Sequence, residues 1–442
     1  SWQDDASAAN VFDLKGARLT SALASAGALN IASQANSQRF PKLAVGGSGW
    51  AVAFQDNRTF ATNPGNIYVT RVSSAGAVLD ANGIVVSTSG NRQTLTAAAG
   101  NGSAYLVAWS DNRGVDGSYD LWGALVSSTG TLLANKVISA ATGDQITPDV
   151  IYDSAQAQFY VAWQDRRGNV DYDIYGARVT ATSSTFTVVD AAGVLISNAT
   201  GDQRRVALAS SSSGYLATWQ DLRVTNNSDI YAQRIGFNGV LTGSAIQLSS
   251  AGTNETLPAV ASDGTNYFVL WQDTRGGANT DDVYGCSVSS AGTAGTEVAI
   301  STAANQQMQP QLVFNASQYF AVWTDFRNNA ASSDIYGSAI STAGVVSPAV
   351  AIANTADAES RPGLAVSNGS IVSVWLRAPT NTQADVYGAR VTAAVASTEG
   401  FGSWAVTTTA EDTPRLAANG SRVLVAYSRY VVSANENSER VR

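Results

Sequence analysis

The chain has 442 residues, of which 45% are hydrophobic and 14% are charged, and its net charge of -8 corresponds to a sequence pI of about 4.7. This composition excludes a disordered acidic chain and predicts a large core. With only three lysines, the chain lacks the electrostatic driving force for binding nucleic acid phosphates. No apolar run reaches the roughly 20 residues of a membrane-spanning helix, so no membrane span is predicted.

A single aromatic position sets the organisation of the whole chain, because it closes an apolar run at nearly constant spacing. The intervals are 52, 55, 54, 56, 52, 52, 52 and 52 residues, and seven of the ten tryptophans occupy this position. The anchors are Trp2, Phe54, Trp109, Trp163, Trp219, Trp271, Trp323, Trp375 and Tyr427. Periods of this length indicate propellers, solenoids or arrays.

Each unit predicts four short strands. In the unit around Trp271 they cover residues 258–261, 267–271, 282–288 and 297–301, with turns rich in Gly, Asn, Asp and Ser between them. Four antiparallel strands make one propeller blade, whereas a solenoid coil uses fewer strands and a shorter period. The predicted fold class is therefore all-β, a β-propeller of four-stranded blades.

The two ends of the chain predict how the ring closes. Residues 13–19 supply a third strand, while residues 414–417 and 423–427 supply a first and a second strand. Joined, they complete one blade from both termini and hide two open sheet edges. The eight intervals favour eight blades in a single domain over residues 1–442, with seven or nine left open. Residues 439–442 have no evident partner.

Acids and arginines recur around each predicted hairpin. An Asp lies two residues after the anchor, an Arg lies two residues after that Asp, and a second Asp opens the returning strand. We expect the acids to cap backbone amides of the loop and the Arg to pair with them. The structural repeat motif comprises Trp109, Asp111, Arg113, Asp120, Trp163, Asp165, Arg167, Asp173, Trp219, Asp221, Arg223, Asp229, Trp271, Asp273, Arg275, Asp282, Trp323, Asp325, Arg327 and Asp334.

The run from Trp163 to Arg167, followed by Asp173-Ile174-Tyr175-Gly176-Ala177-Arg178, resembles the propeller repeats of TolB-type proteins. It resembles more closely the Trp-x-Asp-x-Arg and Asp-Ile-Tyr-Gly-Ala-Arg repeats of large secreted bacterial proteins. The resemblance covers nearly the whole chain and implies a propeller with a binding or scaffold role. It brings no catalytic residues with it. The units of Trp375 and Tyr427 depart from it because they lack the first Asp.

A second recurring position lies three residues before the usual proline of the first strand. It is Gln or Glu in all eight units, and we expect it beside the Asp-Arg hairpins. One interpretation gives these side chains bonds within their own blades, and the other makes them a ring that faces a ligand. The candidates for a ligand-binding face are Gln145, Gln203, Glu255, Gln307, Glu359, Glu411 and, close in sequence, Arg361.

Catalysis is not predicted, because the chain has no histidine for a triad or a zinc site and nearly all its acids occupy repeated positions. Glycoside hydrolysis needs only two carboxyl groups in a groove. Glu359 and Glu411 are acids in successive units and are the catalytic candidates of that alternative. An active site has to break the symmetry of the repeat.

No cofactor is predicted, apart from calcium as an alternative in the loop from Asp111 to Asp120. Asp111, Asp116 and Asp120 make this loop rich in oxygen ligands. The loop does not match the twelve-residue calcium pattern, and Arg113 competes for its carboxylates.

The function predicted is a non-catalytic scaffold, extracellular or on the cell surface. A composition poor in Lys and rich in Ser, Thr and Asn is typical of secreted bacterial proteins. The expected partner is a glycan, a matrix component or a protein, as for an adhesin, or other subunits of a surface assembly. The alternative is a hydrolase or lyase acting on polysaccharide. Because the chain opens inside a repeat at Trp2, a third interpretation makes it one domain of a larger surface protein.

Overall fold

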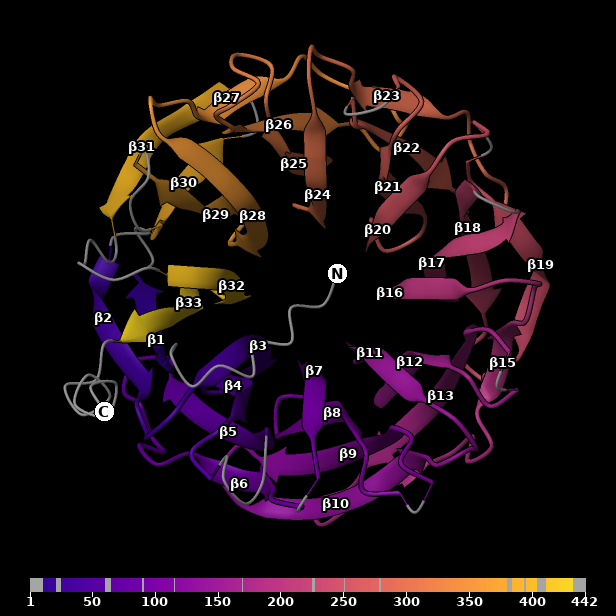
Figure 1. The fold of residues 1–442 in the computed structure, drawn as a ribbon, viewed down its shortest axis with the longest axis vertical. Helices are drawn as coiled ribbons and strands as arrows, with labels where there is room; N and C mark the ends of the chain where they lie inside the picture. Colours follow the sequence, from indigo (N-terminus) through magenta and orange to yellow (C-terminus); the bar gives the residue numbers. More distant parts are fainter. Residues whose placement is uncertain are drawn as a thin grey trace, which may run out of the picture.

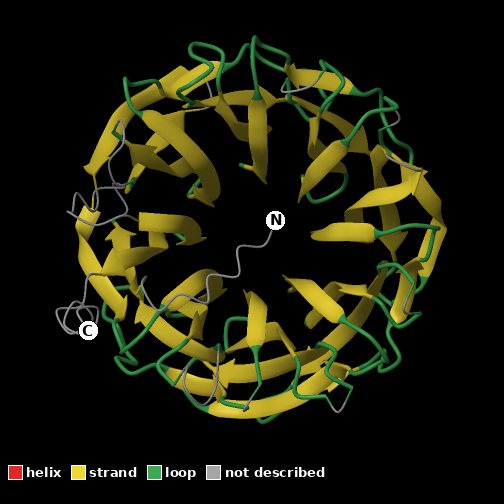
Figure 2. Ribbon diagram, in the orientation of Figure 1, coloured by secondary structure: helices red, strands yellow, loops and turns green. Residues whose placement is uncertain are grey.

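Eight antiparallel sheets surround a central axis in the computed structural model (Figure 1), which describes residues 11–20, 25–59, 65–89, 91–114, 116–168, 170–224, 227–249, 251–277, 280–379, 384–392, 395–403 and 411–431. All regular elements of these residues are strands (Figure 2). None of them forms a helix that is long and apolar enough to cross a membrane. The predicted eight-bladed propeller is therefore confirmed.

Each blade begins with a strand at the axis and ends at the rim. In the first half of the ring the blades are β3 (Gln38–Gly46), β4 (Gly49–Asp56), β5 (Asn66–Ser73) and β6 (Ile84–Ser87); β7 (Gln93–Gly100), β8 (Ala104–Asp111), β9 (Asp120–Ser127) and β10 (Leu132–Ser139); β11 (Gln145–Asp153), β12 (Gln158–Asp165), β13 (Asp173–Ala181), β14 (Phe186–Val188) and β15 (Val194–Ser197); and β16 (Gln203–Ser211), β17 (Gly214–Val224), β18 (Asn227–Ile235) and β19 (Leu241–Gln247). The third of these sheets has five strands because β14 and β15 both pair with β13.

The second half of the ring repeats this order. Its blades are β20 (Glu255–Ser262), β21 (Tyr267–Asp273), β22 (Asp282–Val288) and β23 (Val298–Ser301); β24 (Gln307–Phe314), β25 (Tyr319–Asp325), β26 (Asp334–Ile340) and β27 (Val350–Ala353); β28 (Ala358–Ser367), β29 (Ser370–Ala378), β30 (Asp385–Thr392) and β31 (Val395–Ser403); and the closing blade β32 (Glu411–Asn419), β33 (Arg422–Val431), β1 (Val11–Leu19) and β2 (Ser25–Ala32).

The closing blade takes strands from both ends of the chain, as predicted. β1 pairs antiparallel with β33 over nine residues, from Val11 opposite Val431 to Leu19 opposite Val423. This ladder removes the two open edges that a ring of separate blades would leave. The predicted anchor Trp2 and the surplus residues 439–442 lie outside the described residues.

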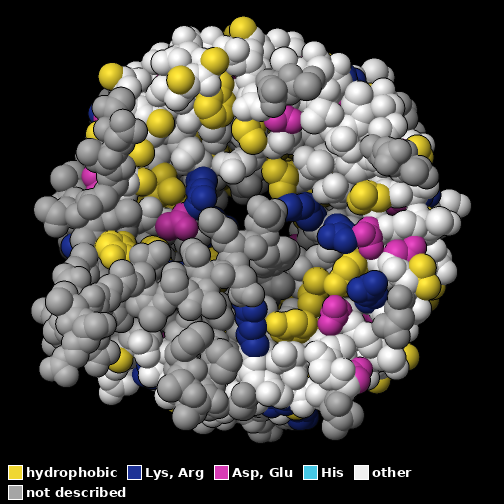
Figure 3. Space-filling view, viewed as in Figure 1, with side chains coloured by type: hydrophobic (Ala, Val, Ile, Leu, Met, Phe, Trp, Pro, Cys, Tyr) yellow, Lys and Arg dark blue, Asp and Glu magenta, His cyan; other side chains and the backbone are white. Residues whose placement is uncertain are grey.

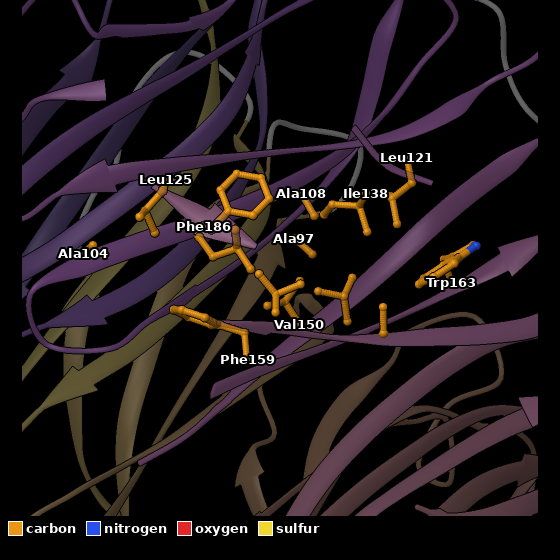
Figure 4. Packing of buried hydrophobic residues seen from close by; sticks show 14 residues of the cluster. Ala97, Ala104, Ala108, Leu121, Leu125, Ile138, Val150, Phe159, Trp163 and Phe186 are labelled. Atoms are coloured by element: carbon orange, nitrogen blue, oxygen red, sulfur yellow. The ribbon is translucent and has the colours of Figure 1, made fainter. Parts of the chain in front are cut away.

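The aromatic anchors fill the wedges between blades. Trp163 is fully buried, in one cluster with Leu121 of the preceding blade and with Phe159 and Phe186. Figure 4 shows Phe159, Phe186 and Val150 in the middle of this cluster, with Trp163 and Leu121 at one end. Burying a side chain of this size contributes about 1.5–3 kcal/mol, so the recurring indole is a major source of cohesion between blades.

Candidate functional site

The recurring Trp, Asp and Arg form a buried unit, here called the hairpin staple, at the end of the second strand. In the blade of β12, Trp163 Nε1 donates to Asp165 Oδ2 at 2.8 Å, and the Arg167 amide donates to Asp165 Oδ1 at 2.9 Å. The Arg167 guanidinium also pairs with Asp165 Oδ2 at 2.6 Å. Because Asp165 is fully buried and both its oxygens accept bonds, this carboxylate is committed to the fold.

The arginine of the staple has a second partner that sequence reasoning missed. The Arg167 guanidinium lies over the Tyr175 ring at 3.6 Å from its centroid, and the Arg223 guanidinium lies over Tyr231 at the same distance. Such a stack adds a cation–π attraction to the ion pair. The signal was the aromatic residue two positions after the second Asp of each unit.

The predicted ring of Gln and Glu side chains is buried rather than presented to a ligand. Gln145 Nε2 donates to the Ala141 and Gly143 carbonyls at 3.1 and 2.8 Å, and its backbone amide donates to the Tyr119 carbonyl of the preceding blade. The candidates Gln145, Gln203, Glu255, Gln307 and Glu359 are 0% exposed, and Glu411 is 2% exposed. Their burial argues against direct ligand contact: the Gln side chains bond to the segment just before their own strand, and the backbone amide at this position joins the blade to the one before it.

The off-pattern acids Glu359 and Glu411 are explained by the residues opposite them. In five blades a Gln faces the Asp of the staple across the first two strands, as Gln145 faces Asp165. Glu359 instead faces Arg377, and Glu411 faces Arg429. The Gln–Asp pair of the other blades is thus replaced by a Glu–Arg pair in these two.

These two acids do not form an accessible catalytic pair. Glu359 is bonded to the Thr355 hydroxyl, lies 3.8 Å from Arg377 Nε, and has its pKa raised to about 7 by burial. Glu411 accepts a bond from the Val386 amide at 2.8 Å. Glycoside hydrolysis needs carboxyl groups that a substrate can reach, so the predicted catalytic use of Glu359 and Glu411 is not supported.

Glu255 occupies the same buried position with a third kind of facing residue. It faces the acidic Asp273, and its oxygens accept bonds from the Ser249 and Thr253 hydroxyls at 3.0 and 3.1 Å. Burial, and then the Asp273 charge, raise the pKa of Glu255 to about 8. At neutral pH a protonated Glu255 carboxyl therefore stands where other blades carry a neutral amide.

The predicted calcium loop is occupied by internal bonds. Asp111 accepts bonds from Trp109 Nε1 and the Arg113 amide, and Asp116 accepts bonds from the amide and hydroxyl of Ser118. Burial, and then the charges of the neighbouring acids Asp116 and Asp111, raise the pKa of Asp120 to about 6. In the described part of the chain no three His, Cys, Asp or Glu side chains are grouped to hold a metal. The calcium site stays a prediction.

Each innermost strand carries a bulge, and the residue at this bulge varies between blades. The residue two positions after the Gln or Glu has a positive φ in seven of these strands, and it lies within the register shift between the first and second strands. The residues are Phe40, Thr147, Arg205, Leu257, Gln309, Arg361 and Thr413. Non-glycine residues rarely adopt this conformation, and bulges re-aim side chains near functional sites. The predicted candidate Arg361 belongs to this bulge ring, where it is exposed and paired with Asp412.

Two positions further along, the inner strands form a second ring, here called the channel waist. Its members are Lys42, Ala97, Asp149, Ala207, Ala259, Gln311, Gly363 and Arg415. Four of these residues are Ala or Gly, and three are charged. Arg415 and Lys42 lie on the adjacent inner strands β32 and β3. The sequence analysis missed the waist because its residues differ between repeats. An alignment of the repeats would have shown this variable position near the invariant Gln or Glu position.

Two of the three charged side chains of the waist, Lys42 and Asp149, are half-buried in the channel wall, whereas Arg415 is exposed. Burial lowers the pKa of Lys42, and Arg415 lowers it further, while Asp149 acts in the opposite direction. Arg415 is in contact with solvent, but the surrounding wall displaces bulk water and lowers its pKa as well. Asp149 accepts bonds from the amides of Leu208 and Val150, and burial raises its pKa. No described carboxylate lies within ion-pair distance of Lys42 or Arg415.

Cations gather at the axis on one face of the propeller. Figure 3 shows Lys and Arg side chains bordering the hollow at the centre of this face. The inner strands supply Arg39 and Lys42 from β3, Arg204 and Arg205 from β16, Arg361 from β28 and Arg415 from β32. β16 and β32 lie across the axis from one another (Figure 1), so cationic residues stand on opposite sides of the channel. The fold and this site define an eight-bladed propeller with an asymmetric, cationic axial channel.

Several solved structures are similar to this chain at low sequence identity. The β-propeller domain of the Trilobed protease from Pyrococcus furiosus aligns with a TM-score of 0.46 and 11% identity, over 79% of this chain and 94% of that chain. The periplasmic gluconolactonase of Pseudomonas aeruginosa aligns with a TM-score of 0.46 and 13% identity, over 77% of this chain and 95% of that chain. A thermostable family-43 glycoside hydrolase has a TM-score of 0.33 and 11% identity, over 60% and 93%. At these values the likeness concerns the fold alone.

No protein-family profile matches the sequence, and no curated protein is significantly similar to it. The resemblance to TolB-type repeats therefore stays a prediction. The prediction that the chain is not an enzyme is wrong, because it took a uniform propeller repeat as a sign of a non-catalytic scaffold. The similar solved structures are mostly enzymes by name, including glycoside hydrolases, puromycin hydrolase and the gluconolactonase.

Proposed function

We propose that the protein binds an acidic glycan, one that carries uronic acid residues, in its axial channel and acts on it there. The observation that carries this proposal is the cationic pair Lys42 and Arg415 on adjacent inner strands, with no described carboxylate within ion-pair distance of either. Two neighbouring positive charges repel each other, and an anion bound between them offsets that repulsion. A carboxylate of the ligand supplies that anion.

The other residues of the two rings favour a sugar over a simple anion. Phe40 is 47% exposed on the bulge ring, where its ring offers a flat apolar surface to a sugar face. Thr147, Thr413 and Gln309 of the same ring carry hydroxyl and amide groups suited to sugar hydroxyls. Aromatic surface, neutral polar groups and cations together match the chemistry of a uronic acid. An extracellular location, predicted from composition, is part of this proposal.

The proposal is tested by calorimetric titration with short oligogalacturonates, oligomannuronates and oligoglucuronates. Their methyl-esterified forms serve as uncharged counterparts. We expect binding of at least one acid oligomer, and loss of about 10–100-fold in affinity for the Arg415→Ala variant, because one charge-assisted contact contributes about 1.5–3 kcal/mol. Arg166→Ala, which removes an exposed arginine from a hairpin loop, is the matched control. Equal affinity for acid and ester forms, or no binding at all, would reject the proposal.

A further inference from the structure

Lys42 differs from the other two lysines of the chain in having no partner. Lys15 Nζ bonds to Asn30 and pairs with Asp13, and Lys136 Nζ donates to the Phe186 carbonyl at 3.0 Å. No described residue lies within hydrogen-bond or ion-pair distance of Lys42 Nζ, although the side chain is half-buried in the channel wall. An enclosed amine without a partner is free to meet a ligand that enters the channel.

The surroundings of Lys42 supply the other requirements of proton-transfer chemistry. Arg415 lies on the neighbouring inner strand, and Arg361 lies on the strand beyond it, near enough to lower the pKa of Arg415. A uronate carboxylate held by the two arginines would bring the adjacent ring carbon toward the lysine.

We infer that Lys42 is the catalytic base of a β-elimination that cleaves the uronic-acid glycan of the proposed function, on which this inference rests. The neutral Lys42 amine removes the proton from C5 of the uronate, and the arginines stabilise the negative charge that develops on its carboxylate. The C4–O bond then breaks, and its electron pair leaves with the oxygen. The electrons of the former C5–H bond form the C4=C5 double bond. The Lys42 ammonium returns the proton to the leaving oxygen, so the reaction needs no cofactor and no water.

The electrostatics of the channel agree with this role. A general base has to be neutral near the working pH, and burial followed by the Arg415 charge lowers the pKa of Lys42. Asp149 acts in the opposite direction and keeps the pKa from falling further. Activity should therefore rise with pH as Lys42 loses its proton, and then level off.

The test measures the ultraviolet absorbance of the unsaturated product with the oligouronates that bind. We expect turnover by the wild-type protein and a loss of about 100-fold or more in kcat for Lys42→Met and Lys42→Arg. Lys42→Arg places a permanent positive charge at this position, so it should not weaken affinity by more than about 3-fold, while it removes the titratable base. Lys136→Met, on the outer strand β10, is the matched lysine control and should leave kcat unchanged.

The outcomes separate this inference from the proposed function. Binding without an unsaturated product at any pH would overturn the lyase role of Lys42 and leave the proposed binding intact. Release of reducing ends without the double bond would indicate hydrolysis and also overturn it. Turnover by Lys42→Arg close to that of the wild type would show that Lys42 is not the base, and would also overturn the inference. Absence of binding would remove the basis of both, and thermal unfolding of each variant checks that it is folded.

Discussion

The hairpin staple and the channel waist lie on the same blades, yet they follow opposite rules. The staple repeats with nearly the same residues around the ring, and its acids are fully buried and bonded on both oxygens. The waist lies on the inner edge of each blade and holds Ala or Gly in four of them and charges in three. The residues that repeat in every blade join the blades, whereas the residues that vary between blades are the ones available for a function. The proposed site is the part of the repeat that is not repeated.

The largest expected effect comes from breaking one staple. Asp165→Ala leaves the Trp163 indole N–H without its acceptor and the Arg167 guanidinium without its carboxylate. Removing one partner of a buried pair typically costs about 3–5 kcal/mol, so we expect a loss of this size in the free energy of unfolding, measured in urea. Asp412→Ala, which breaks the exposed pair with Arg361, is the comparison and should cost less than about 1 kcal/mol. Similar losses for both would mean that the staple is no more important than a surface pair.

A smaller, pH-dependent effect should separate the blade of Glu255 from the others. The folded state raises the pKa of Glu255 from 4.5 to about 8, so it holds the proton more tightly than the unfolded chain does. Stability from this group is therefore complete below about pH 4.5 and is lost as pH rises toward about 8, on the order of 1–3 kcal/mol. Glu255→Gln should flatten the stability curve over this range, measured by urea unfolding at several pH values.

The reciprocal change gives the matched control. Gln307 faces Asp325 in the next blade, so Gln307→Glu recreates there the pair of facing acids found at Glu255 and Asp273. This variant should acquire an additional loss of stability with rising pH. If neither substitution alters the slope of stability against pH, a protonated Glu255 carboxyl does not take the place of the Gln amide of the other blades.

The repeat made the fold predictable, but the proposed site in the channel waist could not be predicted from it. Constant spacing of the anchors, the Asp-x-Arg hairpins and the strand fragments at both ends were enough for eight blades and for the closing pair of β1 and β33. The candidates Glu359 and Glu411 stood out only because they departed from Gln, and that departure depends on Arg377 and Arg429 in the facing strand. Lys42 and Arg415 are nearly 400 residues apart in sequence, and only ring closure makes them neighbours.

The smallest expected effect tests whether Glu359 belongs to the staple network or to chemistry. Glu359→Gln leaves the half-buried Arg377 without one of its two acidic neighbours, since Asp357 remains at 2.6 Å, and should cost about 1–2 kcal/mol of stability. The double variant Glu359→Gln with Arg377→Asp recreates the Gln-Asp pair of the other blades. It should recover part of the loss, and a double-mutant cycle by urea unfolding measures that coupling. If the stability losses of the two single variants simply add in the double variant, Glu359 and Arg377 are not coupled as a pair. Because both residues lie away from the channel waist, affinity for oligouronates should stay the same throughout the cycle, which separates a structural acid from a catalytic one.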